Sequence, residues 1–170
     1  VNFSCTRYET FSGLKGYERT FVGENGNAIH VPEKDILVVK GQEVPTQQGH
    51  LLVLGLGKDV HLKEHRGLED TILEAKDNNG IIVADHPFYK DGIGQYLEQN
   101  PDLVRQLDAI ETFNGEASLW LPSLTPRNAN RKASDFFYDR ENDFKWRAHV
   151  GSLASSDGHS FSELGKNWTA

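Results

Sequence analysis

Acidic and imidazole side chains stand directly beside several short apolar segments of this sequence. These polar residues are Glu43, His50, Asp85, His86, Asp157 and His159. Neutral imidazole and carboxylate groups are ligands for zinc, manganese and iron(II). Carboxylates can also bridge two ions, and paired ions suit the hydrolysis of phosphate esters. The residue types therefore point to metal chemistry, provided that the fold brings them together.

Each of these residues also has a plainer interpretation. A single His or Glu after a strand is more often a capped or solvated group, and Asp157 followed by Gly158 is also typical of a turn. Several such groups at the ends of apolar segments are harder to explain in this way. Spacing alone leaves a metal site and a set of unrelated polar groups open as equal alternatives.

The apolar segments beside these residues are predicted to be buried strands. They are Val1–Cys5, Ile36–Lys40, Leu51–Leu56, Ile81–Ala84, Ala109–Phe113 and Val150–Ala154. Helices are predicted over Gly67–Lys76, over Ile93–Leu107 in two parts divided at Pro101, and over Arg127–Tyr138. Strands that alternate with helices indicate βαβ units and a parallel sheet or barrel, in which the loops after the strands build the active site.

The short polar segment before His50 predicts a different connection. Pro-Thr-Gln-Gln-Gly separates the runs Ile36–Glu43 and His50–Leu56, which indicates a tight hairpin inside the α/β pattern.

Length and composition indicate the class of protein. The 170 residues favour one domain over 1–170, and a net charge of −7 argues against nucleic acid or an anionic membrane as the main partner. A single cysteine, Cys5, excludes an internal disulfide framework, and we expect a cytoplasmic protein. Methionine is absent and the sequence opens on an apolar strand, which favours a fragment of a longer chain.

Five segments around the polar residues resemble the polymerase and histidinol phosphatase (PHP) family. They are Val39-Lys-Gly-Gln-Glu-Val, Gly49-His-Leu-Leu-Val-Leu-Gly-Leu, Val83-Ala-Asp-His-Pro-Phe, Ile110-Glu-Thr-Phe-Asn-Gly and Ser155-Ser-Asp-Gly-His-Ser. The resemblance implies a metal-dependent phosphoesterase on a distorted (β/α)7 barrel that holds two or three divalent ions. Six predicted strands and no His-x-His motif imply that the barrel is incomplete here and lacks its first strand.

The resemblance also assigns ligands ion by ion. It makes Glu43 the bridge between the first and second ions, and it gives the second ion His50 and His86. The first ion keeps only Glu43 and Asp157, because the His-x-His is missing. The third ion keeps mainly His159, because Tyr8 stands where the family has His and Arg7 where it has Asp. One well-liganded site for zinc, manganese or iron is therefore expected.

The function implied is hydrolysis of a small phosphate monoester or a nucleotide-like substrate. Asp157 would orient a water or complete a weaker second site, and Asn114 would face the substrate. The loss of ligands for two ions leaves a second hypothesis open, a degenerate PHP domain that binds metal or ligand without catalysis. Amidohydrolase-like cleavage of a C–N bond ranks last. We further expect a second copy or a rearranged segment to cover the open sheet edge.

The remaining histidines have plainer interpretations. His61 and His65 share the spacing of a helical zinc pair, but the flanking sequence favours a solvated loop. His30 is interpreted as a loop residue, and His149, just before the last strand, as structural.

Overall fold

The computed structural model of the chain describes residues 16, 18–118, 129–139, 149–159, 162–163, 167 and 169. The described strands form two sheets, one of three strands and one of five. The predicted strand Val1–Cys5 and the positions Arg7 and Tyr8 lie outside the described residues. The five-stranded sheet positions the predicted site residues.

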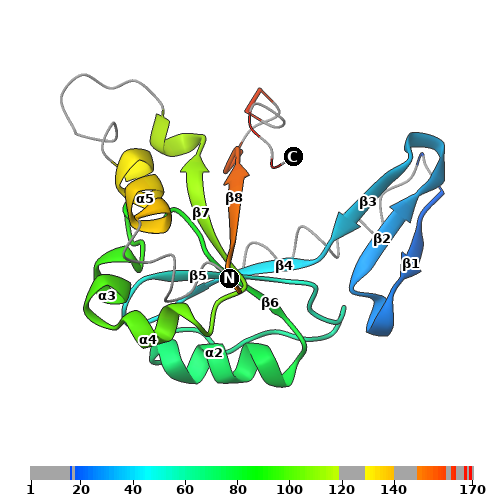
Figure 1. Cartoon of the computed structure of the whole chain (residues 1–170). Helices are drawn as coiled ribbons and strands as arrows, with labels where there is room; N and C mark the ends of the chain where they lie inside the picture. The colour runs from blue at the N-terminus through cyan, green and yellow to red at the C-terminus, as the bar shows by residue number, and fades with distance from the viewer. Residues whose placement is uncertain are drawn as a thin grey trace.

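The five-stranded sheet has the order β4-β5-β6-β7-β8 (Figure 1). Its strands are Gly41–Pro45 (β4), His50–Leu54 (β5), Ile81–Ala84 (β6), Ala109–Asn114 (β7) and Gly151–Ser155 (β8). The pairs β4–β5 and β5–β6 are antiparallel, whereas β6–β7 and β7–β8 are parallel. Residues 46–49, which join β4 to β5, are too few for a crossover. The predicted hairpin is therefore confirmed, with its first strand beginning at Gly41.

The expected distorted (β/α)7 barrel is wrong. The described strands form an open mixed sheet and a separate three-stranded sheet, and they do not close on each other. The reason is strand direction. The hairpin turns β5 back against β4, and β5 also runs antiparallel to β6, so only β6–β7 and β7–β8 have the parallel geometry that a barrel repeats.

The smaller sheet is an antiparallel meander. It contains Thr20–Val22 (β1), Ala28–Val31 (β2) and Ile36–Val39 (β3), joined by the short 3-10 helices Glu24–Gly26 (η1) and Pro32–Lys34 (η2). Figure 1 shows this sheet next to the start of β4, on the right of the view. The predicted strand Ile36–Lys40 belongs to this sheet and not to the one that carries the site.

A buried lysine anchors the junction of the two sheets. Lys40, between β3 and β4, is 1% exposed. Its Nζ donates to the carbonyl oxygens of Gly57, Lys58 and Val60 at 2.8, 2.8 and 2.6 Å. These bonds hold the chain at the point where it leaves one sheet and enters the other.

Four helices pack around the larger sheet in the described part of the chain. They are Leu68–Asp77 (α2), Gly94–Gln99 (α3), Pro101–Val104 (α4) and Ala129–Tyr138 (α5). These bounds confirm the predicted helices to within a few residues, including the division at Pro101. The core combines residues of β5, β6 and these helices, among them Leu51, Ile72, Ile82 and Leu97.

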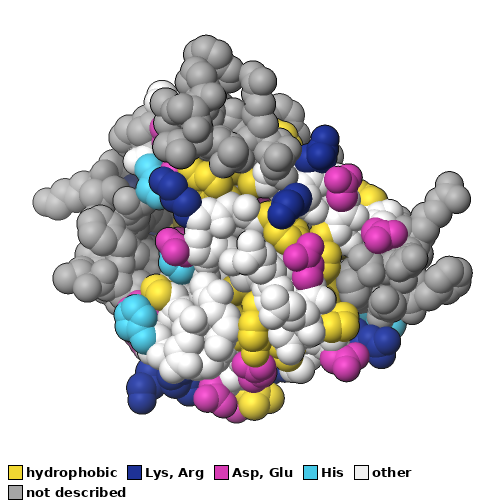
Figure 2. Space-filling model, turned by 90° about the vertical axis from the view of Figure 1, so that its left-hand side faces the viewer, with side chains coloured by type: hydrophobic (Ala, Val, Ile, Leu, Met, Phe, Trp, Pro, Cys, Tyr) yellow, Lys and Arg dark blue, Asp and Glu magenta, His cyan; other side chains and the backbone are white. Residues whose placement is uncertain are grey.

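The outer surface mixes side-chain types. On the face shown in Figure 2, acidic and basic side chains of the described residues lie among apolar ones. None of the described helices is long and apolar enough to cross a bilayer.

Candidate metal centre

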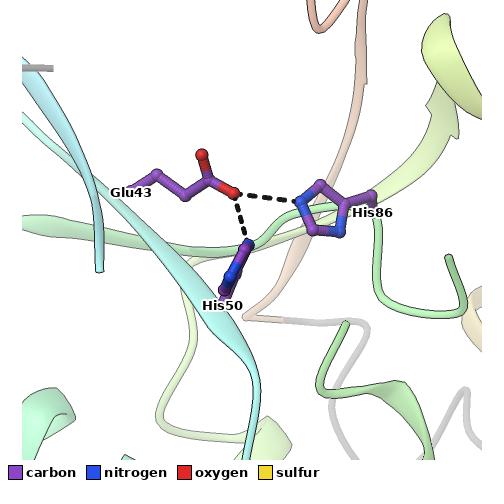
Figure 3. Close-up of side chains that lie close together, drawn as sticks. All are labelled: Glu43, His50 and His86. Atoms are coloured by element: carbon purple, nitrogen blue, oxygen red, sulfur yellow. Dashed lines mark hydrogen bonds and ion pairs between the residues drawn. The ribbon is translucent and has the colours of Figure 1, made fainter. Parts of the chain in front are cut away.

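Glu43 and His50 lie on the same face of the β4–β5 hairpin. In the register Glu43 is directly opposite Leu52, which makes His50 its diagonal neighbour. Val44, next along β4, is buried on the other face, so the Glu43 side chain points away from the core. His50 Nδ1 lies 2.7 Å from Glu43 Oε1 (Figure 3).

His86 comes from the loop that follows β6. Its backbone N–H donates to Glu111 Oε2 at 2.6 Å, which ties this loop to β7. Its φ of 29° lies in the left-handed region that residues other than glycine ordinarily avoid. Held in this way, His86 Nε2 lies 3.1 Å from Glu43 Oε1. The ligand atoms of Glu43, His50 and His86 all lie within 4.8 Å of one another.

The same loop packs against the start of β5. The backbone N–H of His50 donates to the carbonyl of Asp91 at 2.7 Å, and Gly92 forms a parallel bridge with His50. A Cβ at Gly92 would lie 2.4 Å from the carbonyl oxygen of His86. Close backbone packing that only glycine allows therefore places the two histidines beside each other.

The three groups shift each other's pKa. The hydrogen bond from His86 lowers the pKa of Glu43 to about 2, and the charges of both imidazoles add to this effect, while burial opposes it. Burial favours the neutral form of His86, but the hydrogen bond to Glu43 and the charges of Asp85, Glu43 and Asp157 outweigh it and raise its pKa to about 9. At neutral pH the positive charge on His86 thus offsets the surrounding carboxylates, as a bound cation would.

A second group of metal-binding residue types lies at the ends of β7 and β8. It consists of Glu116, Asp157 and His159, whose ligand atoms also lie within 4.8 Å of one another. Glu116 begins the 3-10 helix Glu116–Ser118 (η3) after β7, and the other two follow β8. Because β7 and β8 are parallel, their carboxyl ends meet at one edge of the sheet.

Both groups line one pocket of about 190 Å³. The sequence-predicted residues in its wall are Glu43, His50, His86, Asp157 and His159. The remaining lining residues are Tyr89, Lys90, Asp91 and Glu116. Carboxylates and imidazoles thus predominate among the polar groups around this space. Such a donor set fits zinc, manganese or iron(II).

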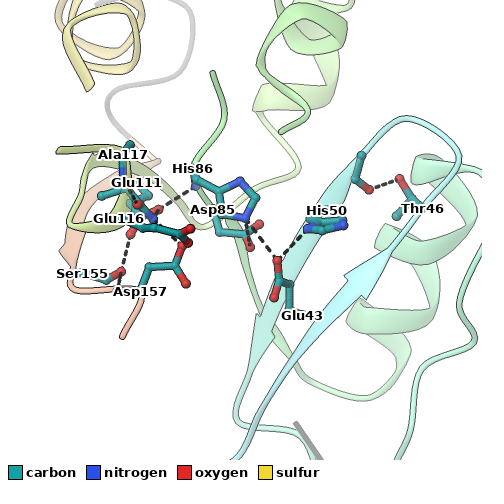
Figure 4. A network of polar contacts seen from close by, with 12 residues as sticks. Glu43, Thr46, His50, Asp85, His86, Glu111, Glu116, Ala117, Ser155 and Asp157 are labelled. Atoms are coloured by element: carbon teal, nitrogen blue, oxygen red, sulfur yellow. Dashed lines mark hydrogen bonds and ion pairs between the residues drawn. The ribbon is translucent and has the colours of Figure 1, made fainter. Parts of the chain in front are cut away.

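Asn114 lies behind the pocket wall. It was predicted to face the substrate, but it is 2% exposed and is not a lining residue. Its Nδ2 donates to Asp157 Oδ2 at 3.1 Å and to Glu111 Oε2 at 3.0 Å. Figure 4 shows Glu111 in contact with Ser155 and with the backbone of His86. This network positions Asp157 and His86 relative to each other.

Sequence reasoning did not assign Asp85, Lys90 or Glu116 to the site. The signal for Asp85 was present, since it directly follows a buried strand, as His86 does. Glu116 directly follows the recognised segment that ends at Gly115, and Lys90 lies two residues after the one that ends at Phe88. Whether these two side chains reach the pocket depends on how the loops after β6 and β7 fold, which residue spacing does not predict.

The other histidines have mixed outcomes. His61 and His65 are exposed and lie outside helices and strands, which confirms the loop interpretation. His149 lies in a turn before β8. His30 lies in β2, so its interpretation as a loop residue is wrong.

The chain was compared with known proteins and protein families. No family model, no curated protein and no solved structure matches this chain.

Proposed function

We propose that this chain binds a divalent cation through Glu43, His50 and His86 and hydrolyses a small phosphate ester in the adjoining pocket. One observation carries the proposal. A glutamate and two imidazoles from β4, β5 and the loop after β6 place their ligand atoms within 4.8 Å of one another, in the wall of a pocket. Two His and one carboxylate with open positions are a familiar catalytic zinc set. The resemblance of the five sequence segments to PHP phosphoesterases supports the choice of reaction.

The chain's own residues have separate tasks in this proposal. Glu43, His50 and His86 hold the ion. When bound, a divalent cation offsets charge on phosphoryl oxygens and makes a water nucleophilic at neutral pH. Asp157, fixed by the amide of Asn114, orients that water or accepts its proton. Lys90, in the pocket wall, supplies positive charge for the phosphate group.

A sequence observation favours a second candidate, a non-catalytic metal-binding module. In the alignment with the PHP segments, Tyr8 takes the place of a ligand, and a phenol with pKa ≈ 10 is a poor ligand for zinc or manganese at neutral pH. Such a module would bind an ion at Glu43, His50 and His86 without turning over a phosphate ester.

Phosphate release and metal content, measured together, test both candidates. We would load the chain with Mn²⁺ or Zn²⁺ and assay a panel of phosphate monoesters. We expect turnover that chelation abolishes and that Glu43→Gln lowers at least about 100-fold, since a ligand is lost. Glu98→Gln, the same change on exposed α3, is the matched control and keeps activity. Bound metal without turnover would select the second candidate, and no bound metal would eliminate both.

A further inference from the structure

Asp85 is a buried carboxylate beside the candidate metal centre. It is 6% exposed, and within the described part of the chain its Oδ1 is buried without a hydrogen-bond partner. A buried carboxylate oxygen without a partner is costly unless a cation or donor reaches it. Asp85 Oδ1 therefore lacks a cation or a donor, while Asp85 Oδ2 faces His86.

The spacing between Asp85 and His86 fits two ligands of one ion. Asp85 Oδ2 lies 3.4 Å from His86 Nε2, the nitrogen that also faces Glu43 Oε1 at 3.1 Å. Two atoms bound to a tetrahedral zinc ion at about 2.1 Å each are separated by about 3.4 Å. In Figure 4 the Asp85 carboxylate lies beside the His86 ring, toward Glu43.

The backbone holds the turn that carries both side chains. Asp85 is outside the group of residues whose ligand atoms all lie within 4.8 Å of one another, so its carboxylate turns toward the ion on binding. Asp85 and His86 are consecutive, and the backbone N–H of His86 is held by Glu111 Oε2 at 2.6 Å. The two side chains consequently share one anchored turn at the end of β6. Because its backbone is anchored, Asp85 has little main-chain freedom to lose when its side chain binds an ion.

We propose that Asp85 is a fourth protein ligand of the divalent cation held by Glu43, His50 and His86, an inference that rests on the proposed function. The centre would then have two carboxylates and two neutral imidazoles, so the negative charges balance one divalent cation, and the water that the proposed function needs would take a fifth position. One of these carboxylates, Glu43, is partly exposed, whereas the other, Asp85, is buried.

Metal affinities of matched variants test the assignment without an activity assay. We would measure the Kd of the full chain for Zn²⁺ and Mn²⁺ by chelator competition. Asp85→Asn and Asp85→Ser are expected to weaken both at least about tenfold. Asp59→Asn makes the same charge change at an exposed residue outside the pocket wall and is expected to leave the Kd unchanged.

The outcomes separate this inference from the function on which it rests. Tight binding by the wild-type chain together with unchanged affinity in both Asp85 variants would overturn the inference alone. A wild-type chain that binds neither metal would overturn the function as well. A structure of the Mn²⁺-loaded wild-type chain gives the answer even if the variants do not fold. An Asp85 oxygen about 2.1–2.4 Å from the ion supports the assignment, and one beyond about 3.5 Å overturns it.

Discussion

At the scale of single residues, the main feature of the candidate metal centre is that its carboxylates need a positive charge beside them. Glu43 is surrounded by two imidazoles, and His86 by the carboxylates of Glu43, Asp85 and Asp157. Without an ion, protonation of His86 supplies the balancing charge. A metal ion that binds must displace this proton, so the protonation of His86 and metal binding compete.

The raised pKa of His86 predicts how the stability of the metal-free chain depends on pH. Its pKa rises from 6.5 to about 9 on folding, so between these values the folded state binds more protons than the unfolded state. The stabilisation is complete below pH 6.5 and is lost as pH rises through about 9. One proton gives a slope of at most about 1.4 kcal/mol per pH unit. Urea unfolding in chelator from pH 6 to about 9.5 measures this slope.

His86→Asn is the control for that experiment, because it removes the titrating ring and leaves the other groups in place. The difference in stability between the wild-type chain and the variant is expected to shrink across the window. A difference that stays constant, or grows with pH, would contradict the assignment of the proton to His86.

At the scale of elements, the loop after β6 aligns the two histidines through its backbone. Gly92→Ala is expected to weaken zinc binding at least about tenfold, because its Cβ would lie 2.4 Å from the carbonyl oxygen of His86 and displace the loop. Gly151→Ala is the control, since a Cβ there would meet its nearest atom at an ordinary 3.6 Å. Chelator competition measures the zinc affinity of both variants. Equal affinities of the Gly92→Ala and Gly151→Ala variants would show that the loop after β6 does not position the two histidines.

The junction of the two sheets depends on Lys40. Lys40→Met keeps the apolar stem but leaves the carbonyls of Gly57, Lys58 and Val60 without this donor. We expect a loss of about 2–4 kcal/mol in the free energy of unfolding, measured with urea. Lys63→Met, at an exposed position, should change it by less than about 0.5 kcal/mol. A similarly small effect for Lys40→Met would rule out the anchoring role.

Element positions were more predictable than element directions. The β6 bounds Ile81–Ala84 were predicted without error, since a short apolar run between a helix stop and polar residues has one good interpretation. The direction of β5 relative to β4 was predicted from the short connection before it, whereas the antiparallel pairing of β5 with β6 was not, because no tight turn joins those two strands. β1 and β2 were not predicted, because Thr20–Val22 has only three residues and the four residues Ala28–Val31 include His30, which was interpreted as a loop residue.

At the scale of the whole molecule, the candidate site joins distant parts of the chain. Glu43, His86 and Asp157 were predictable because each follows an apolar run closely, and the strand order brings those strand ends to one pocket. The burial of Asp85 and the position of Asn114 behind the wall were not predictable, since both depend on how loops turn after β6 and β7. The sequence shows the residue types and their positions along the strands, whereas the burial of each side chain depends on how the loops pack.

Because the proposed ligands come from β4, β5 and the loop after β6, metal binding should stabilise the fold as a whole. Ion at one hundred times its Kd stabilises by about 2.7 kcal/mol, which for a chain of this size raises Tm by roughly 5–10 °C. Chelation should reverse the shift, which calorimetry or thermal unfolding measures. Glu43→Gln is expected to lose the shift and Glu98→Gln to keep it. A Tm that does not respond to zinc, manganese or iron(II) would contradict the account.

The most direct measurement is anomalous diffraction at the zinc edge from crystals of the chain soaked with zinc. The account predicts a peak about 2.0–2.2 Å from a Glu43 carboxylate oxygen, His50 Nδ1 and His86 Nε2. Crystals that take up zinc elsewhere, or that show no peak between these three side chains, would contradict it.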